Sequence, residues 1–218
     1  MCFKYRVPEG PGVDEKALGI FSRVSSLTAR AAGHRIRHIL GESIKDGMRV
    51  LDIGTGPGTI PLNLKRSFPK AHFIGMDISR TMINMARDYG AKGGIEFPVL
   101  MADGQCLPFG PASIDCVISL FAMHHMDQPG RLLKEIDRVL KSDGRLLVID
   151  FRRDINGMLF STINTLWQMS FLFSAGRTGF ADSVRSAWLP GEIETILKKE
   201  NLDRFRVLTN RLELWVTS

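Results

Sequence analysis

A buried strand that runs into a glycine-rich turn is the feature that most constrains the fold of this chain. The turn lies in residues 50–58 (VLDIGTGPG), and a helix is expected to begin near Thr59. Glycines at alternate positions let the backbone approach a ligand where a Cβ atom would clash. The turn therefore predicts a bound nucleotide-like cofactor. Asp77 ends the next expected strand and suits the hydroxyls of a ribose.

Strand-like and helix-like segments alternate along most of the chain. Apolar strands between helices favour a parallel sheet covered on both faces. Two last runs joined by a tight turn at Asn210 predict an antiparallel hairpin. We expect Ser79 to cap the second helix, Gly90 to close it, and Asp143-Gly144 to form a turn. The expected strands are about 48–53, 71–76, 95–101, 114–120, 145–150, 203–208 and 211–217, and the expected helices about 59–67, 79–89, 127–140 and 190–201.

Two regions stand outside this alternation. Residues 1–45 are expected to hold a loose arm over 1–13 and cap helices at about 14–27 and 28–40, ahead of a main domain at 46–218. An apolar insertion at about 154–190 includes residues 155–176, which carry no charged side chain. Interspersed polar residues argue against a membrane span. A substrate lid or dimer surface is expected, with peripheral membrane contact through 155–176 as the alternative.

The charge of the chain is basic but evenly spread. Its 218 residues carry a formal net charge of +6, with a pI near 9.5. Because Lys and Arg are scattered among Asp and Glu, a solvated mixed surface is favoured over a nucleic-acid patch. Cys2, Cys106 and Cys116 lack metal-ligand spacing. They fit a reduced, cytoplasmic setting, and the first residues lack the apolar core of a signal peptide.

The residues around the glycine turn separate two kinds of cofactor. A dinucleotide turn wants a third glycine where Thr59 stands, and Pro57 removes an N–H that a phosphate would use. Asp52 lies two residues before the first glycine. A buried carboxylate repels pyrophosphate but attracts an ammonium or sulfonium cation. The turn therefore favours a cationic cofactor over a dinucleotide.

Five ordered segments carry a family resemblance. Residues 52–58 (DIGTGPG), 75–79 (GMDIS), 102–109 (ADGQCLPF), 109–117 (FGPASIDCV) and 140–147 (LKSDGRLL) resemble the motifs of class I S-adenosylmethionine-dependent methyltransferases. The resemblance covers about 48–150 and implies a Rossmann-like seven-stranded sheet, mostly parallel with an antiparallel C-terminal hairpin strand. It implies that Asp77 binds ribose and that Asp103 accepts from the adenine amine. The implied cofactor-binding residues are Asp52, Gly54, Thr55, Gly56, Asp77, Ile78, Met82, Asp103, Gly104, Gln105 and Ser119.

Five of these residues also have a purely structural interpretation. Gly54 and Gly56 could form only a tight turn, and Asp77 could cap a helix in competition with Ser79. Asp103 could be a turn former beside its glycine. Met82 could be ordinary helix core.

Candidate catalytic residues follow the fourth strand. His124 and His125 lie at the carboxyl end of that strand, where ligands bind in such sheets. Either could accept a proton near neutral pH, and the alternative is loop architecture. Asp150 ends the fifth strand, but the sequence offers no partners for it as a metal ligand, so no metal is expected.

The acceptor is constrained mainly by exclusion. The loop after the fourth strand lacks the Asn/Asp-Pro-Pro-Tyr/Phe of amino methylation and the Pro-Cys of cytosine methylation. The chain most resembles the branch with ubiquinone and menaquinone C-methyltransferases, and its uncharged insertion suggests a small apolar or aromatic acceptor. An RNA or protein methyltransferase and a non-catalytic S-adenosylmethionine-binding module are the alternatives. The chain is expected to be a monomer or homodimer.

Overall fold

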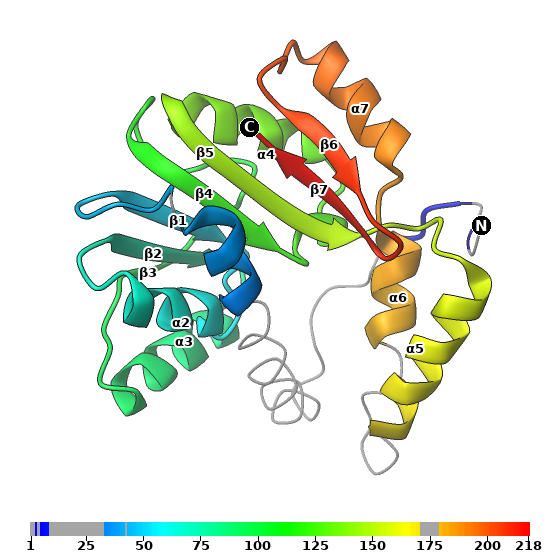
Figure 1. Ribbon diagram of the computed structural model, residues 1–218, viewed down its shortest axis with the longest axis horizontal. Helices are drawn as coiled ribbons and strands as arrows, with labels where there is room; N and C mark the ends of the chain where they lie inside the picture. The colour runs from blue at the N-terminus through cyan, green and yellow to red at the C-terminus, as the bar shows by residue number, and fades with distance from the viewer. Residues whose placement is uncertain (1–2, 4, 9–32, 42, 171–178) are drawn as a thin grey trace.

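A computed structural model describes residues 3, 5–8, 33–41, 43–170 and 179–218. Seven strands form one sheet in the order β3-β2-β1-β4-β5-β7-β6, and only β7 runs antiparallel to its neighbours (Figure 1). This confirms the predicted fold class. The strands are β1 Arg49–Ile53, β2 His72–Asp77, β3 Val99–Met101, β4 Ile114–Leu120, β5 Leu140–Phe151, β6 Arg206–Thr209 and β7 Glu213–Thr217.

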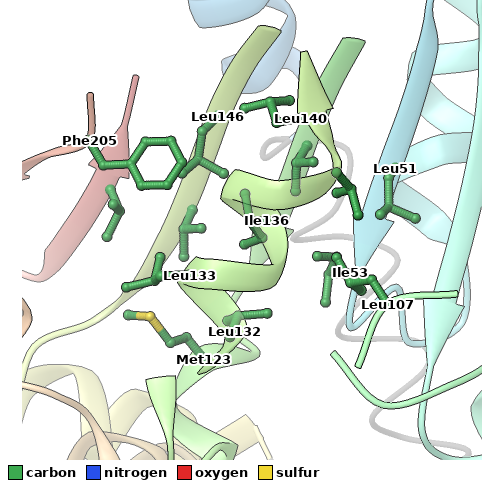
Figure 2. Close-up of a cluster of buried hydrophobic side chains, with 14 of the residues drawn as sticks. Leu51, Ile53, Leu107, Met123, Leu132, Leu133, Ile136, Leu140, Leu146 and Phe205 are labelled. Carbon is green, nitrogen blue, oxygen red and sulfur yellow. The ribbon is translucent and has the colours of Figure 1, made fainter. Parts of the chain in front are cut away.

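Helices cover both faces because the strand side chains alternate between two cores. Leu51 and Val117 belong to one core, whereas their neighbours Val50 and Cys116 belong to the other. The first core is closed by α4 and α7 (Figure 2), and the second by α2 and the helix over 33–40. The helices are α2 Thr59–Ser67, α3 Arg80–Lys92, the 3₁₀ turn η1 Met123–His125, α4 Pro129–Val139, α5 Gly157–Ser170, α6 Gly179–Ser186 and α7 Pro190–Lys199.

The strand order places a switch point between β1 and β4. From β1 the chain builds outward to β2 and β3, and it then returns to place β4 on the other side of β1. Ligands bind outside the carboxyl ends of the strands at such a point. Those ends carry the glycine turn after β1, Asp77 as the last residue of β2, and η1 after β4.

Several predicted boundaries were wrong for local reasons. Helix α3 continues through Gly90 and ends at Gly93, whose N–H bonds to the carbonyl of Tyr89 (2.9 Å). Strand β5 begins at Leu140 instead of after a turn at Asp143-Gly144. Its register pairs Ile114 with Leu140 but Cys116 with Arg145, so residues 141–144 form a bulge inside the strand. Strand β3 covers only 99–101.

The N-terminal region and the insertion both pack beside the sheet. The expected helix at 14–27 lies outside the described residues, and the next helix is described over 33–40. The arm was wrongly expected to be loose at Arg6 and Val7, which bond to the segment around α6. The described part of the insertion forms α5 and α6. Within the described part of the chain, no helix is both long and apolar enough to cross a membrane.

Candidate active site

The glycines of the turn have different tasks. Gly54 and Gly56 adopt positive φ angles of 71° and 53°. A Cβ atom on Gly54 would lie 2.3 Å from the Cβ of Ala122, so this glycine lets β1 pass close to the end of β4. A Cβ atom on Gly56 would meet nothing within 4 Å. Gly54 therefore serves packing, whereas Gly56 borders open space in which a ligand could lie.

Asp77 holds the turn from the neighbouring strand. Its Oδ2 accepts from the N–H of Gly56 (2.9 Å), and its Oδ1 accepts from the N–H of Ser79 (2.9 Å). The hydroxyl of Ser79 accepts from the N–H of Met82 (3.4 Å), so Ser79 is the residue that caps α3. Each carboxylate oxygen of Asp77 can still accept a further hydrogen bond. Its geometry thus allows the predicted ribose contact.

Asp52 is a buried acid beneath the turn. Only 2% of the residue is exposed, and its Oδ2 accepts from the hydroxyl of Thr55 (2.7 Å). Burial raises the pKa of the Asp52 carboxyl to about 7, against the opposing effect of the Thr55 hydroxyl, and the charge of Asp77 raises it further. Two acids therefore share the carboxyl ends of β1 and β2. A cation bound beside them would lower the pKa of Asp52 and be attracted by both.

The predicted adenine turn lies next to these acids. The N–H of Ala102 donates to the carbonyl of Asp77 (3.1 Å), which joins this turn to the end of β2. Asp103 is exposed, and its Oδ1 accepts from the N–H of Gln105 (2.9 Å). Asp103 is therefore a turn former, and its side chain also faces solvent, where a base could reach it.

Other predicted cofactor residues differ sharply in accessibility. Ile78 is 71% exposed and Met82 8% exposed, and Gly104 is buried. Ser119 has no exposed surface, and its hydroxyl donates to the carbonyl of Ile53 (2.8 Å). With no exposed surface, Ser119 cannot contact a cofactor directly in this conformation. Ser119 ties β4 to the end of β1 below the turn.

A buried histidine–aspartate pair lies on the other side of the switch point. The Nδ1 of His124 lies 2.6 Å from Oδ1 of Asp150, and the backbone N–H of His124 donates to Oδ2 (2.7 Å). His124 and Asp150 are 2% and 1% exposed, whereas His125 is exposed. A carboxylate can only accept, so a neutral His124 ring carries its proton on Nδ1. Its Nε2 is then the proton-accepting nitrogen.

The sequence named His124 but missed its partner. Asp150 was considered only as a possible metal ligand, and its contact with His124 was not predicted from the sequence. The available signal was that Asp150 lies at the carboxyl end of β5 and His124 follows the carboxyl end of the neighbouring strand β4, since Leu120 pairs with Ile149. Among the described residues, no group of three His, Cys, Asp or Glu side chains is placed to hold a metal ion.

Aromatic side chains join the insertion to this pair. The ring of Phe151 stacks on Phe121 (4.6 Å between centroids) and meets Phe180 of α6 edge-on (5.4 Å). Phe180 in turn stacks on Phe160 of α5 (5.8 Å). The centroid of the His124 ring lies 6.0 Å from the centroid of the Phe151 ring. The insertion is therefore attached beside His124 through aromatic packing.

This geometry agrees with a family match. A family model described as a methyltransferase domain matches residues 51–148, from the glycine turn to the core of β5. Residues 51–148 thus match a methyltransferase domain, and their motifs resemble those of class I S-adenosylmethionine-dependent methyltransferases. The matched methyltransferase domain includes both acids, the adenine turn and His124.

Known sequences point to the same branch as the motifs did. The ubiquinone/menaquinone biosynthesis C-methyltransferase UbiE of Pseudomonas entomophila is 31% identical over 75% of this chain. The match covers 65% of that relative, which is less than two thirds of its length. The protein of the same name from Desulfotalea psychrophila is 27% identical over 93% of this chain and 84% of its own length. The chain thus resembles the small-molecule branch of the class.

A solved structure supports the fold. A methyltransferase from Aquifex aeolicus, described as dependent on S-adenosylmethionine, superposes with a TM-score of 0.67 over 94% of this chain and 98% of its own. The two sequences are 21% identical. The likeness therefore extends beyond the matched domain to nearly the whole chain.

Proposed function

We propose that this protein transfers a methyl group from S-adenosylmethionine to a small apolar or aromatic acceptor. The observation that carries the proposal is Asp52, a buried acid with a pKa raised to about 7 at the end of β1. Such a group is better accommodated beside a cation than beside a phosphate. It lies next to Gly56, which borders open space. This combination favours a sulfonium or ammonium ligand over a dinucleotide.

The donor side would hold S-adenosylmethionine with three acids. Asp77 would accept from the ribose hydroxyls, Asp103 would accept from the adenine amine, and Asp52 would attract the cationic end. S-adenosylmethionine supplies an electrophilic methyl group on its sulfonium. What these residues contribute is orientation, since aligned in-line attack removes much of the entropic barrier.

The acceptor side would supply a base. Asp150 holds the neutral ring of His124 with the proton on Nδ1, which prepares Nε2 to take a proton from the acceptor. Because His124 is 2% exposed, an acceptor must displace the side chains that cover the ring to reach it. His125 is exposed, and the centroid of its ring lies 4.2 Å from that of His124. It would line the acceptor pocket.

An apolar acceptor suits the walls on this side. The aromatic cluster around Phe151 and Phe180 lies next to His124, and residues 155–176 carry no charge. Two relatives are named for C-methylation in ubiquinone and menaquinone biosynthesis. We therefore propose that the insertion forms a lid over a quinol- or phenol-like acceptor. A cytoplasmic location and a monomeric or homodimeric state remain predictions.

The donor can be tested by calorimetry. We expect S-adenosylmethionine and S-adenosylhomocysteine to bind and NAD not to bind. Asp52→Asn should weaken S-adenosylmethionine at least 10-fold while the variant stays folded, since the change is nearly isosteric. Binding of NAD alone would overturn the proposal.

The acceptor class can be tested by the release of S-adenosylhomocysteine. A panel of hydroquinones and phenols should support turnover, whereas tRNA and protein substrates should not. Turnover on RNA, with binding that weakens steeply as salt rises, would support the nucleic-acid alternative instead. Donor binding without turnover on any substrate would support a non-catalytic module.

A further inference from the structure

We propose that Arg6 in the N-terminal arm is a positioning residue for His124. The inference rests on the proposed function, in which His124 is the base. The guanidinium of Arg6 touches the backbone of the 3₁₀ turn that carries His124, although the two residues lie 118 positions apart. Its side chain is 13% exposed, so most of it is enclosed by the protein.

Arg6 binds the turn at its two carbonyls. Its Nη2 donates to the carbonyl of His124 (3.0 Å) and to the carbonyl of Met126 (3.1 Å). Its Nη1 donates to Oδ1 of Asp127 (3.1 Å). Asp127 is 72% exposed, so this ion pair contributes little by itself. The two carbonyls, which receive charge-assisted hydrogen bonds, are the contacts that fix the turn.

The other edge of the guanidinium is anchored in the insertion. Its Nε donates to the carbonyl of Ser186 (2.7 Å), and its Cζ lies 4.3 Å from the centroid of the Trp188 ring. The backbone N–H of Val7 donates to the carbonyl of Arg185 (3.2 Å), which holds the arm against the end of α6. Arg6 therefore bridges the end of α6 and η1.

His124 is held by opposite charges at the two ends of its backbone. Asp150 accepts its N–H and binds its ring, and Arg6 donates to its carbonyl. With both in place the peptide units on either side of His124 cannot rotate, and the ring stays aimed at Asp150. Without Arg6 the carbonyl of His124 loses this charge-assisted donor, and the ring can leave the geometry in which Nδ1 carries the proton.

Only an arginine has the required shape. The planar fork of a guanidinium reaches carbonyls of two segments at once while its face lies on an indole. A lysine supplies one compact charge and cannot span the carbonyls of His124 and Ser186 together. The inference thus predicts that charge alone does not replace Arg6.

The test compares Arg6→Lys and Arg6→Ala with Arg185→Ala in the full chain. Arg185 makes a matched control because it belongs to the same region, with its Cζ 5.0 Å from the ring centroid of Phe3, and its side chain makes its ion pair with Asp182. Ring-nitrogen NMR, assigned with His124→Gln, reports the tautomer of His124 without any acceptor. Calorimetry with S-adenosylhomocysteine reports the donor side.

In both Arg6 variants we expect His124 to lose its preference for a proton on Nδ1, with donor affinity changed less than 2-fold. Turnover on a hydroquinone should fall at least 10-fold with an unchanged KM for S-adenosylmethionine, and Arg185→Ala should resemble the wild type. If Arg6→Ala does not fold, Arg6→Lys and Arg6→Gln carry the comparison. Unchanged His124 resonances in folded Arg6 variants would overturn the inference. Shifted resonances with full turnover in His124→Gln would instead reject His124 as the base and leave its positioning by Arg6 intact.

Discussion

The proposed donor side of the site lies within residues 52–103, whereas the proposed acceptor side also draws on the N-terminal arm and the insertion. Thr55 and Asp52 are 3 positions apart, and Gly56 and Asp77 are 21 apart. On the acceptor side, His124 and Asp150 are 26 apart, and Arg6 bridges 118 positions to His124 and 180 to Ser186. A turn formed by residues close in the sequence can be retained in related proteins together with the ligand that it binds. An acceptor pocket assembled from the arm and the insertion can diverge without disturbing the donor.

The two sides also use buried acids differently. Asp150 accepts from the backbone N–H groups of His124 and Phe151 (2.7 Å each) and binds the His124 ring. Asp52 is buried beside Asp77 with its pKa raised to about 7. The first acid stabilises local structure, and the second is poorly accommodated until a cation is present. Asp150→Asn should therefore weaken the local structure around His124, whereas Asp52→Asn should stabilise the ligand-free protein and weaken donor binding.

The largest effect is expected for Asp150→Asn. The amide offers one accepting oxygen where the carboxylate offers two, so either the backbone N–H or the ring Nδ1–H of His124 loses its partner. We expect methyl transfer to fall about 10²–10⁴-fold, as for loss of a general base, with donor affinity unchanged. Turnover and calorimetry on one preparation separate these quantities. A parallel loss of donor affinity would break the distinction between the two sides.

The paired changes Gly54→Ala and Gly56→Ala should divide folding from binding. At Gly54 a methyl group would meet Ala122 at 2.3 Å in a left-handed backbone, so the free energy of unfolding should fall by about 3 kcal/mol or more. At Gly56 only the backbone strain applies, about 1–2 kcal/mol. Denaturant unfolding measures both values.

The ligand dependence of the same pair sharpens the comparison. We expect Gly56→Ala to lose donor affinity at least 10-fold because its methyl group enters the open space of the turn. If Gly56→Ala binds S-adenosylmethionine as the wild type does, that space is not where the donor lies.

Asp52→Asn should raise the stability of the ligand-free protein and weaken the binding of the donor. With a folded pKa of about 7, above its unfolded value, the carboxyl binds more protons when folded. The free energy of unfolding of the ligand-free protein should therefore fall as pH rises from about 4 to about 7 and level off above that. The amide removes this slope and should stabilise the protein at pH 8.

Donor binding should show the opposite pH trend. A cationic donor favours ionised Asp52, so the affinity of the wild type should rise between about pH 6 and pH 8, and that of Asp52→Asn should stay flat. Calorimetry at three pH values measures both. A wild-type affinity independent of pH would remove Asp52 from the donor site.

The smallest stability effect is expected on the outer surface of α5. Met158 is 81% exposed and Met169 59% exposed, so changing each to Ser should alter the free energy of unfolding by about 0.5 kcal/mol or less. Phe180→Ala on the neighbouring helix should cost about 3–5 kcal/mol because the ring is 4% exposed. Size-exclusion chromatography and vesicle flotation then show whether the methionines serve a dimer or a membrane. An unchanged result in both leaves the lid as the role of α5.

The parts predicted well share a local cause. The strand–turn–helix at residues 50–67 follows from apolar residues, glycines and a helix start that are contiguous in the chain. The boundary errors arose where an element continues through residues that locally favour ending it. Gly90 stays inside α3, and the bulge at 141–144 lies within β5 instead of ending it. Arg6 is held by partners more than a hundred residues away.

The sequence by itself determined the mostly parallel sheet, the glycine turn, and the acids suited to a methyl donor. These features depend on side-chain periodicity and on backbone freedom over short spans. Only the tertiary structure decided that Asp150 holds His124, that Ser119 supports the turn from below, and that Arg6 reaches His124. Those contacts depend on which strand ends become neighbours and on how the arm and insertion pack there, and local sequence does not encode them.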